Sequence, residues 1–513
     1  MTPQHTYITT TIPYVNARPH LGFALELVQA DVLARRARQR GEQVRALTGT
    51  DDNSLKNVLA AKAEGVPVQD FVDRNAATFA ALREPLALSF DDFIRTSSDP
   101  RHRTGVEKLW RLCAERGDLY RKYYEGLYCV GCEQFYAPED LVDGRCPDHG
   151  TEPQVVSEEN WFFRLSRYAS QLKELITDGR LRIQPASRRN EILSLIDGGL
   201  HDFSVSRSQA RAHGWGIPVP GDPGQVVYVW WDALGNYVTS LGFGDDHPDF
   251  ATWWAGSERR IHLAGKGVIR FHAVYWPAML LSAGLPLPTE ILVHDYLTID
   301  GHKISKSSGV TADPAQLVEQ VGTDAVRWWL LREVPRVGDA DFTLERLVER
   351  ANGELAGGVG NLVHRTITMI HRYRAGIVPV SATGTGFEVL GQACEQAPGA
   401  IDAALDDFDF RQATSAVWRI VDEANRAIDA TRPWQLAKEG RDGELDSALA
   451  ALYAACLSLA TSLAPFLPTA AELITAQCTP IDGGPLLSTA LYPWPIDGVL
   501  PPSTALFPRI EAS

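Results

Sequence analysis

Residues 7–23 read YITTTIPYVNARPHLGF. The stretch opens with a run of β-forming residues that ends at Pro13, and a histidine and a glycine follow at positions 20 and 22. From Leu21 to Arg40 the apolar residues recur at the spacing of one helix face, and Gly41 follows where glycine often ends a helix. A second strand is predicted over Gln43–Thr48. Strand, helix and strand in this order predict a parallel α/β sheet.

The rest of the chain divides by its pattern of apolar residues. The α/β rhythm breaks between about residues 99 and 221, and further strands are predicted at 226–230, 261–264 and 291–293. From about residue 344 only helical periodicity remains, which predicts a helical bundle. We therefore predict a Rossmann-like sheet in two halves, residues 1–115 and 226–310, that are separated by an insertion at 116–225. A linker at 311–345 and a helical domain at 346–513 would follow.

Composition narrows the class of protein. The 513 residues carry a net charge of −15, with 45% hydrophobic and 22% charged residues, as in an ordinary globular protein. This charge argues against a non-specific nucleic-acid coat, although one local basic face could still bind RNA. Neither a secretory signal nor an apolar run long enough to cross a membrane is apparent. Seven cysteines, an odd number, fit a reducing compartment, so we expect a cytoplasmic location.

Two distant segments carry residues that suit phosphate groups. His20-Leu21-Gly22-Phe23 precedes a helix whose first N–H groups and positive dipole end favour an anion. For so short a motif alone, a histidine without function is favoured by about three to one. Lys303-Ile304-Ser305-Lys306-Ser307-Ser308-Gly309 joins two lysines and several hydroxyls, which can neutralise charge on transferring phosphates. A solvated basic loop explains this second pattern less well, because it follows a β-run.

Together the two segments resemble the HIGH and KMSKS motifs of class I aminoacyl-tRNA synthetases. Residues 12–20, 229–237 and 271–280 are similar to the methionyl branch in particular, and the resemblance runs from Tyr7 to about Leu467. It implies a split catalytic domain that binds ATP with Mg²⁺, and a helical anticodon-binding domain. The implied catalytic residues are His20, Lys303 and Lys306. The implied ATP-binding residues are His20, Gly22, Lys303, Ser305, Lys306 and Ser307.

The resemblance also implies a pocket for methionine. Its residues would be Ile12, Tyr14, Asp51, Trp230, Ala233, Leu234, Tyr237 and His294. Aromatic walls suit a polarizable thioether, and Tyr14 or His294 could offer the sulfur a weak hydrogen bond. Asp51 would hold the substrate ammonium, helped by the backbone carbonyl of Ile12. Without the resemblance, Trp230 and Tyr237 would be taken as ordinary core aromatics.

Four possible zinc ligands lie in the predicted insertion. Cys129-x₂-Cys132 is followed after thirteen residues by Cys146-x₂-His149. Cys₃His is a structural, tetrahedral zinc set, and unrelated cysteines would rarely form two such pairs. We predict one structural Zn²⁺ per chain, which one subtype of the resembled family carries at this place.

The helical region holds three residues that suit single-stranded RNA. Asn361 and Arg365 stand at i and i+4 on one predicted helix face, and Trp434 follows Pro433 at the start of another. Amide, guanidinium and indole groups can bond to base edges and stack on bases. The resemblance implies that these three positions read the anticodon of tRNA(Met). From the residues alone, a capping amide, a surface arginine and a buried indole are favoured.

Four positions depart from the family pattern near the expected active site. They are Phe23 for the second histidine of HIGH, Asn53 in a stretch that usually ends His-Gly, Gly267 for aspartate in Gly-Lys-Asp, and Asp295 for glycine in His-Gly. Neutral drift and a second-copy or inhibitor-tolerant enzyme explain them about equally well. The expected reaction is ATP-dependent methionylation of tRNA by a monomer. The rival functions are an adenylate-forming paralogue outside translation and an inactive tRNA-binding protein.

Overall fold

The computed structural model describes residues 4–131, 134–136, 138–147, 150–299, 301–304, 312–380, 386–481 and 498–511. The chain forms two compact units. The first comprises Met1–Arg83, Leu88–Asp295 and Lys306–Gly309, and the second comprises Glu84–Ala87, Tyr296–Ser305 and Val310–Ser513.

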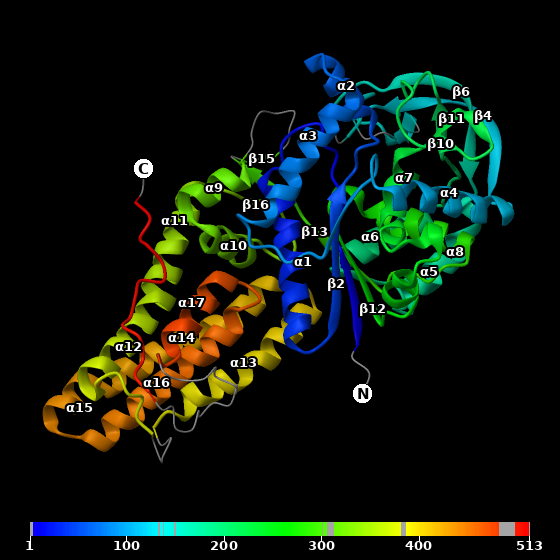
Figure 1. Cartoon of the computed structure of the whole chain (residues 1–513). Coiled ribbons are helices and arrows are strands. Elements are labelled where there is room, and N and C mark those ends of the chain that lie inside the picture. The colour runs from blue at the N-terminus through cyan, green and yellow to red at the C-terminus, as the bar shows by residue number, and fades with distance from the viewer. Residues whose placement is uncertain are drawn as a thin grey trace. The chain divides into compact units, whose positions relative to one another are not determined.

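A parallel sheet of six strands organises the first unit (Figure 1). Its order is β3-β2-β1-β12-β13-β7, and all neighbouring strands run parallel. The strands are β1 (His5–Thr9), β2 (Gln43–Thr50), β3 (Asp92–Arg95), β7 (Arg182–Gln184), β12 (Arg259–Gly265) and β13 (Glu290–His294). The fold class expected from the sequence is confirmed.

The strand order identifies where a ligand should bind. From β1 the chain runs outward through β2 to β3, whereas β12 lies on the other side of β1 and leads outward to β13. Such a reversal of order leaves a crevice at the carboxyl ends of the two central strands, where open α/β sheets bind their ligands. Here that place is the carboxyl ends of β1 and β12, which pair in the register Thr9↔His262.

Helices connect and cover the strands of this unit. They are α1 (Leu21–Gln39), α2 (Leu55–Glu64), α3 (Val68–Ala80), α4 (Pro100–Glu115), α5 (Ala169–Thr177), α6 (Ala186–Asp197), α7 (Val229–Thr239) and α8 (Trp276–Ala283). The helix predicted after the first strand is confirmed as α1. Gly41 has a φ of +85°, which L side chains rarely adopt and which explains glycine just beyond α1.

The insertion consists mainly of antiparallel strands. One sheet has the order β5-β4-β6-β8, and another has the order β10-β11-β9. The strands are β4 (Leu119–Cys129), β5 (Gln134–Tyr136), β6 (Gln154–Phe163), β8 (Phe203–Ser204), β9 (Ser206–Ser208), β10 (Pro218–Val219) and β11 (Asp222–Val227).

Two details differ from the sequence-based expectation. Residues 226–230 are not a strand of the parallel sheet: β11 ends at Val227 in an antiparallel sheet, and α7 begins at Val229. A short apolar run fits a buried helix as well as a buried strand, so its periodicity could not decide. In addition, the middle region returns to the parallel sheet through β7, which pairs with β13 at its edge.

The second unit is mainly helical. Its strands are short: β14 (Leu297–Ile299), β15 (His302–Lys303) and β16 (Ala340–Asp341). Its helices are α9 (Pro314–Val321), α10 (Thr323–Arg332), α11 (Leu344–Arg350), α12 (Asn361–Arg374), α13 (Glu388–Asp406), α14 (Phe410–Thr431), α15 (Pro433–Glu439), α16 (Asp442–Leu463) and α17 (Pro468–Cys478). A π-helical segment, Ala351–Gly360, joins α11 to α12. The expected helical bundle is confirmed.

One helix of the bundle is more apolar than the sequence analysis allowed. By length and composition α16 could cross a membrane, but 61% of its most apolar window is buried inside the protein. It packs against α13, α14 and α17. A helix that packs against several others inside a bundle has the same composition, so the burial of α16 accounts for this feature.

Candidate active site

His20 lies at the N-cap position of α1, immediately beyond the end of the first strand and its loop. Its side chain makes no capping hydrogen bond. A Cβ atom at Gly22 would lie only 3.1 Å from Cε1 and Nδ1 of the His20 ring. Glycine therefore lets the imidazole lie close over the first turn of the helix, where the dipole favours an anion.

Glu26, one turn further along α1, joins the helix to the loop after β1 and to the end of β13. Its side chain is 4% exposed, and Oε1 accepts hydrogen bonds from the Thr11 N–H (2.5 Å) and Oγ1 (2.6 Å). Its Oε2 lies 2.8 Å from Nε2 of His294, whose Nδ1 donates to the Asp295 carbonyl. Burial disfavours the imidazolium, but the hydrogen bond and charge of Glu26 outweigh it and raise the pKa of His294. Both ring nitrogens of His294 are thus engaged by the chain itself.

Tyr14 and Asp51 come together at the end of β2. They form an isolated parallel bridge, and the Asp51 N–H donates to the Pro13 carbonyl (2.9 Å). Asp51 is 2% exposed. Its Oδ1 accepts from the backbone N–H of Asn53 (3.2 Å). The loop therefore presents a buried carboxylate next to the tyrosine, as a site for an ammonium group requires.

The remaining predicted pocket residues share one face of α7. Trp230, Ala233, Leu234 and Tyr237 stand at i, i+3, i+4 and i+7, which is one stripe of a helix. Trp230 stacks on Phe271, with ring centroids 3.8 Å apart and planes at 4°. Ile12 packs against the same core cluster. The helix thus supplies an apolar and aromatic wall.

Two histidines fix Tyr237 in this wall. The Nδ1 of His272 donates to the Val268 carbonyl (2.9 Å), so its Nε2 can accept from the Tyr237 hydroxyl (2.7 Å). The His262 ring on β12 lies 4.2 Å from the Tyr237 ring. Burial lowers the pKa of both histidines and raises the pKa of Tyr237, so all three rings are neutral. The tyrosine is thereby held against the end of β12.

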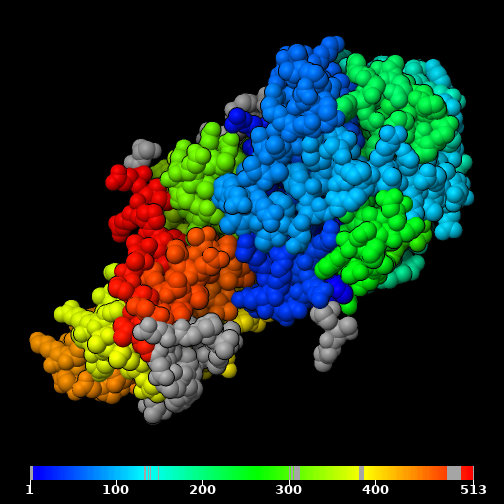
Figure 2. Space-filling view, in the orientation of Figure 1, coloured from blue at the N-terminus to red at the C-terminus, as the bar shows by residue number. Residues whose placement is uncertain are grey.

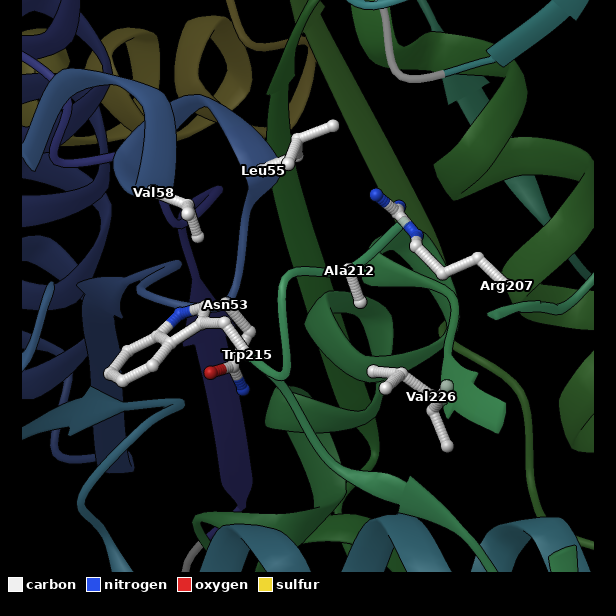
Figure 3. A pocket seen from close by; sticks show the side chains of 8 residues that line it. Asn53, Leu55, Val58, Arg207, Ala212, Trp215 and Val226 are labelled. Carbon is white, nitrogen blue, oxygen red and sulfur yellow. The ribbon is translucent and has the colours of Figure 1, made fainter. Parts of the chain in front are cut away.

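A pocket adjoins the loop that follows Asp51. Asn53 lies beside Trp215 on one side of it, and the Trp215 Nε1–H donates to the Asp52 carbonyl (2.9 Å) (Figure 3). The lining residues are Asn53, Leu55, Val58, Arg207, Ala212, Trp215, Val226 and Val227. The loop thus lies between the parallel sheet and the second antiparallel sheet of the insertion.

The three predicted anticodon residues are accessible in the second unit. Asn361 begins α12 and is exposed, and Arg365, one turn on, is partly exposed. Trp434 is 44% exposed on α15, directly after Pro433 at the first helical position. Figure 1 shows α15 at one end of the helical unit, and Figure 2 shows the same segment on the surface. A half-exposed indole is available to stack on a base.

Comparison with known proteins assigns the family. The model for tRNA synthetases class I (M) matches residues 6–155 and 136–367. A methionine–tRNA ligase of Brucella suis is 38% identical over 521 residues, covering 100% of this chain and 99% of the relative. One of Caldanaerobacter subterraneus is 40% identical over 474 residues, covering 92% of this chain and 73% of the relative. A structure of Mycobacterium tuberculosis methionyl-tRNA synthetase in complex with methionyl-adenylate matches with a TM-score of 0.93 and 37% identity, covering 99% of this chain and 100% of that one.

The chain belongs to the class I methionyl-tRNA synthetases. Its activity is therefore that of an aminoacyl-tRNA ligase, namely a methionine–tRNA ligase. The expectation drawn from the two phosphate motifs is confirmed at the level of family, fold and activity. The roles of individual residues remain predictions.

Part of the predicted synthetase site lies outside the described residues. Ser305, Lys306 and Ser307 are among them, and of Lys303 only the backbone is described, in β15 opposite Thr298. Of the predicted zinc ligands, Cys132 and His149 also lie outside. Cys129 and Cys146 are each 1% exposed and pack with Tyr136 in one small cluster. Among the side chains that are described, no group of three or more metal ligands gathers.

The departures from the synthetase pattern have partners in this chain. Phe23 is buried and packs edge-to-face on Phe79, with centroids 5.3 Å apart. Asp295 forms an ion pair with Arg188 of α6 and lies 4.0 Å from the Lys266 ammonium. Asn53 donates to Asp232 (2.7 Å). Only Gly267 shows no contact that explains it.

Several residues that shape this site could not be recognised from the sequence. Glu26, His262 and His272 were not singled out, because a lone acidic residue in a helix or a lone histidine usually has no special role. The one available signal was Glu26 in an otherwise apolar stretch of α1, where a charge is seldom buried without a partner. Asp232 lay inside a quoted motif but received no role.

Proposed function

We propose that the site formed by Asp51 and α7 binds methionine, activates it with ATP, and passes it to the 3′ end of tRNA(Met). One observation carries this proposal. A single face of α7 supplies an aromatic and apolar wall of four residues, while the Tyr14–Asp51 bridge supplies a buried carboxylate at the end of β2. In such a site the carboxylate can pair with the ammonium group of an amino acid, and the aromatic wall can hold a soft, unbranched side chain.

Activation requires that the methionine carboxylate and the α-phosphorus of ATP meet. A carboxylate oxygen forms a bond to phosphorus, the bond to pyrophosphate breaks, and methionyl-adenylate results. In the second step the terminal ribose hydroxyl of tRNA attacks the methionyl carbonyl, and AMP leaves. Asp51 holds the ammonium group and the α7 wall holds the thioether, so these residues contribute mainly by orientation.

The nucleotide is proposed to lie at the start of α1. His20 over Gly22, with the dipole of α1 behind it, suits the phosphates, as the 3.1 Å approach at Gly22 supports. Lys303, Ser305, Lys306 and Ser307 are proposed to neutralise charge on the phosphates during transfer. Mg²⁺ bound with ATP would supply further charge stabilisation there.

The insertion is proposed to hold one structural Zn²⁺. The ligands would be Cys129, Cys132, Cys146 and His149. The packing of Cys129 and Cys146 around Tyr136 supports this set, because residues seventeen positions apart bring two buried thiols into one cluster. The metal would stabilise the turn-rich part of the insertion, which has few other buried apolar residues.

The helical unit is proposed to read the CAU anticodon through Asn361, Arg365 and Trp434. Their exposure, and the i, i+4 spacing of the first two on α12, support this role. We also propose a cytoplasmic location. The six cysteines within the described residues are all free and buried, as expected in a reducing compartment.

The test of the proposed chemistry is ATP–pyrophosphate exchange with each of the twenty amino acids, followed by charging of tRNA(Met). We expect exchange with methionine alone and transfer to tRNA(Met). Exchange with a different amino acid would favour a paralogue that acts outside translation. No exchange, with tRNA binding retained, would favour an inactive tRNA-binding protein.

A further inference from the structure

A buried chain of polar groups ties the Asp51 loop to two helices. Asn53, two residues after Asp51, donates through Nδ2 to Oδ2 of Asp232 (2.7 Å) and to the Thr96 carbonyl (3.2 Å). The other oxygen of Asp232 accepts from Nε2 of His102. The Nδ1 of His102 forms a hydrogen bond with Thr239 Oγ1 (2.8 Å). The chain thus runs from the loop through α7 to α4 and back to α7.

Beyond Asn53, which is partly exposed, this chain is deeply buried, and its carboxylate accepts from two donors. Asp232 is 1% exposed, and His102 and Thr239 are 0% exposed. A buried carboxylate is costly unless it is paired, so the loss of either donor leaves it under-satisfied. α4 and α7 also pack too closely to adapt, because a Cβ at Gly105 would lie 2.4 Å from Cγ2 of Thr239. Asp232 is therefore a rigid anchor.

The anchor lies on the opposite face of α7 from the proposed methionine wall. Trp230 and Tyr237 lie on the wall face, whereas Asp232 and Thr239 lie about half a turn away. The Asn53–Asp232 bond therefore joins the loop that carries Asp51 to the helix that carries the wall. The backbone N–H of Asn53 donates a hydrogen bond to Oδ1 of Asp51 (3.2 Å), so the hydrogen-bonded chain reaches the Asp51 carboxylate directly.

We propose that Asn53 is a positioning residue that, through Asp232 and His102, sets the Asp51 carboxylate at the correct distance from the α7 wall. It thereby determines affinity for the α-ammonium group of the substrate, and not affinity for the thioether. The inference rests on the proposed role of Asp51. Asn53 is one of the positions at which this chain departs from the family pattern, and the proposal assigns a function to that departure.

The test uses two methionine analogues, each of which lacks one of the two charged groups of the substrate. Methioninol keeps the ammonium group and lacks the carboxylate, and 4-(methylthio)butanoate keeps the carboxylate and thioether and lacks the ammonium group. For Asn53→Ala we expect KM for methionine and the inhibition constant of methioninol to rise about 10-fold, the effect of one hydrogen bond to a charged group. The inhibition constant of 4-(methylthio)butanoate and KM for ATP should stay within about twofold. A general loosening of the fold would change all four.

Three further variants test whether the effect of Asn53→Ala has the proposed cause. Asn53→His restores a side-chain donor and should return methioninol inhibition to near the native value. Asp232→Asn, similar in shape, should reproduce the selective loss, and circular dichroism at the assay temperature checks that each variant is folded. Asp51→Asn tests the underlying role and should weaken methioninol at least as much as Asn53→Ala does.

The outcomes separate the two proposals. If Asp51→Asn weakens methioninol but Asn53→Ala and Asp232→Asn do not, the positioning role is wrong and the role of Asp51 stands. If Asp51→Asn has no effect on methioninol, the proposed binding of the ammonium group is wrong and the inference falls with it. Equal weakening of both analogues in a folded Asn53→Ala would also overturn the positioning role.

Discussion

Asp324→Asn should stabilise the helical unit at neutral pH. Asp324 is near the N-terminus of α10, where one oxygen accepts from the Ala470 backbone N–H and Oδ1 is buried without a hydrogen-bond partner among the described residues. Burial, only partly offset by the charge of Arg327, raises its pKa from 3.8 to about 6. Ionisation above pH 6 therefore works against folding.

The magnitude follows from the pKa difference. A rise of about two pKa units corresponds to about 3 kcal/mol of unfolding free energy. Since the folded pKa lies above the unfolded value, the favourable contribution of Asp324 is complete below about pH 4. It is lost as the pH rises through 6. Asparagine does not ionise, so the variant should gain up to about 3 kcal/mol over the parent at pH 7.5 and almost nothing at pH 4.

Urea unfolding followed by tryptophan fluorescence from pH 4 to 8 measures this difference. Trp328 and Trp329 are buried on the same helix and report locally. Arg327 keeps its donors engaged in the variant, since they bind the carbonyls of Phe466 (2.7 Å), Leu86 (2.9 Å) and Pro465 (3.1 Å). Glu395→Gln, an exposed carboxylate on α13, is the matched control and should change little. A stability difference for Asp324→Asn that is independent of pH would refute the reasoning.

Three further results are expected. Trp434→Ala should lower tRNA charging roughly 5- to 150-fold, since base stacking contributes about 1–3 kcal/mol, while ATP–pyrophosphate exchange is retained. Leu473→Ala, a similarly exposed apolar residue, is the control, and equal loss in both assays would contradict the anticodon role. Cys129→Ser should remove the proposed stoichiometric Zn²⁺ and lower the melting temperature, and an unchanged metal content would rule out the proposed zinc site. Glu26→Gln should lower the pKa of His294 and so move the pH profile of KM for methionine to lower pH; an unmoved profile would show that this ion pair does not affect binding.

The parts of the fold that were predicted correctly depend on local patterns. The segment from β1 through α1 to β2 could be predicted because a β-rich run, a helical repeat and a terminal glycine all agree within fifty residues. β7 could not, because its three residues become a strand only by pairing with β13 more than one hundred positions away. The bundle helices have long periodic patterns, so a helical region beginning near residue 344 could be predicted.

Residues of the candidate site could be proposed from the sequence only where they match a family motif position by position. His20, Asp51 and the α7 residues are proposed from the resemblance, whereas Glu26, His262 and His272 act through contacts that the sequence does not display. His262 shows why. Its Nδ1 lies 2.6 Å from Thr9 Oγ1 and its Nε2 accepts from Trp276 (3.1 Å), so both partners are set by packing across the sheet.

The helical conformation of residues 229–239 has a consequence for the chemistry of the site. In a strand, Trp230 and Asp232 would point to the same side, and a buried carboxylate would lie beside the apolar wall. In α7 they lie on opposite faces, so the wall stays apolar while Asp232 finds its donors on α4 and in the Asp51 loop. The proposed thioether wall and the buried carboxylate of Asp232 can then share one short helix, because the charge has its hydrogen-bond donors on the face away from the wall.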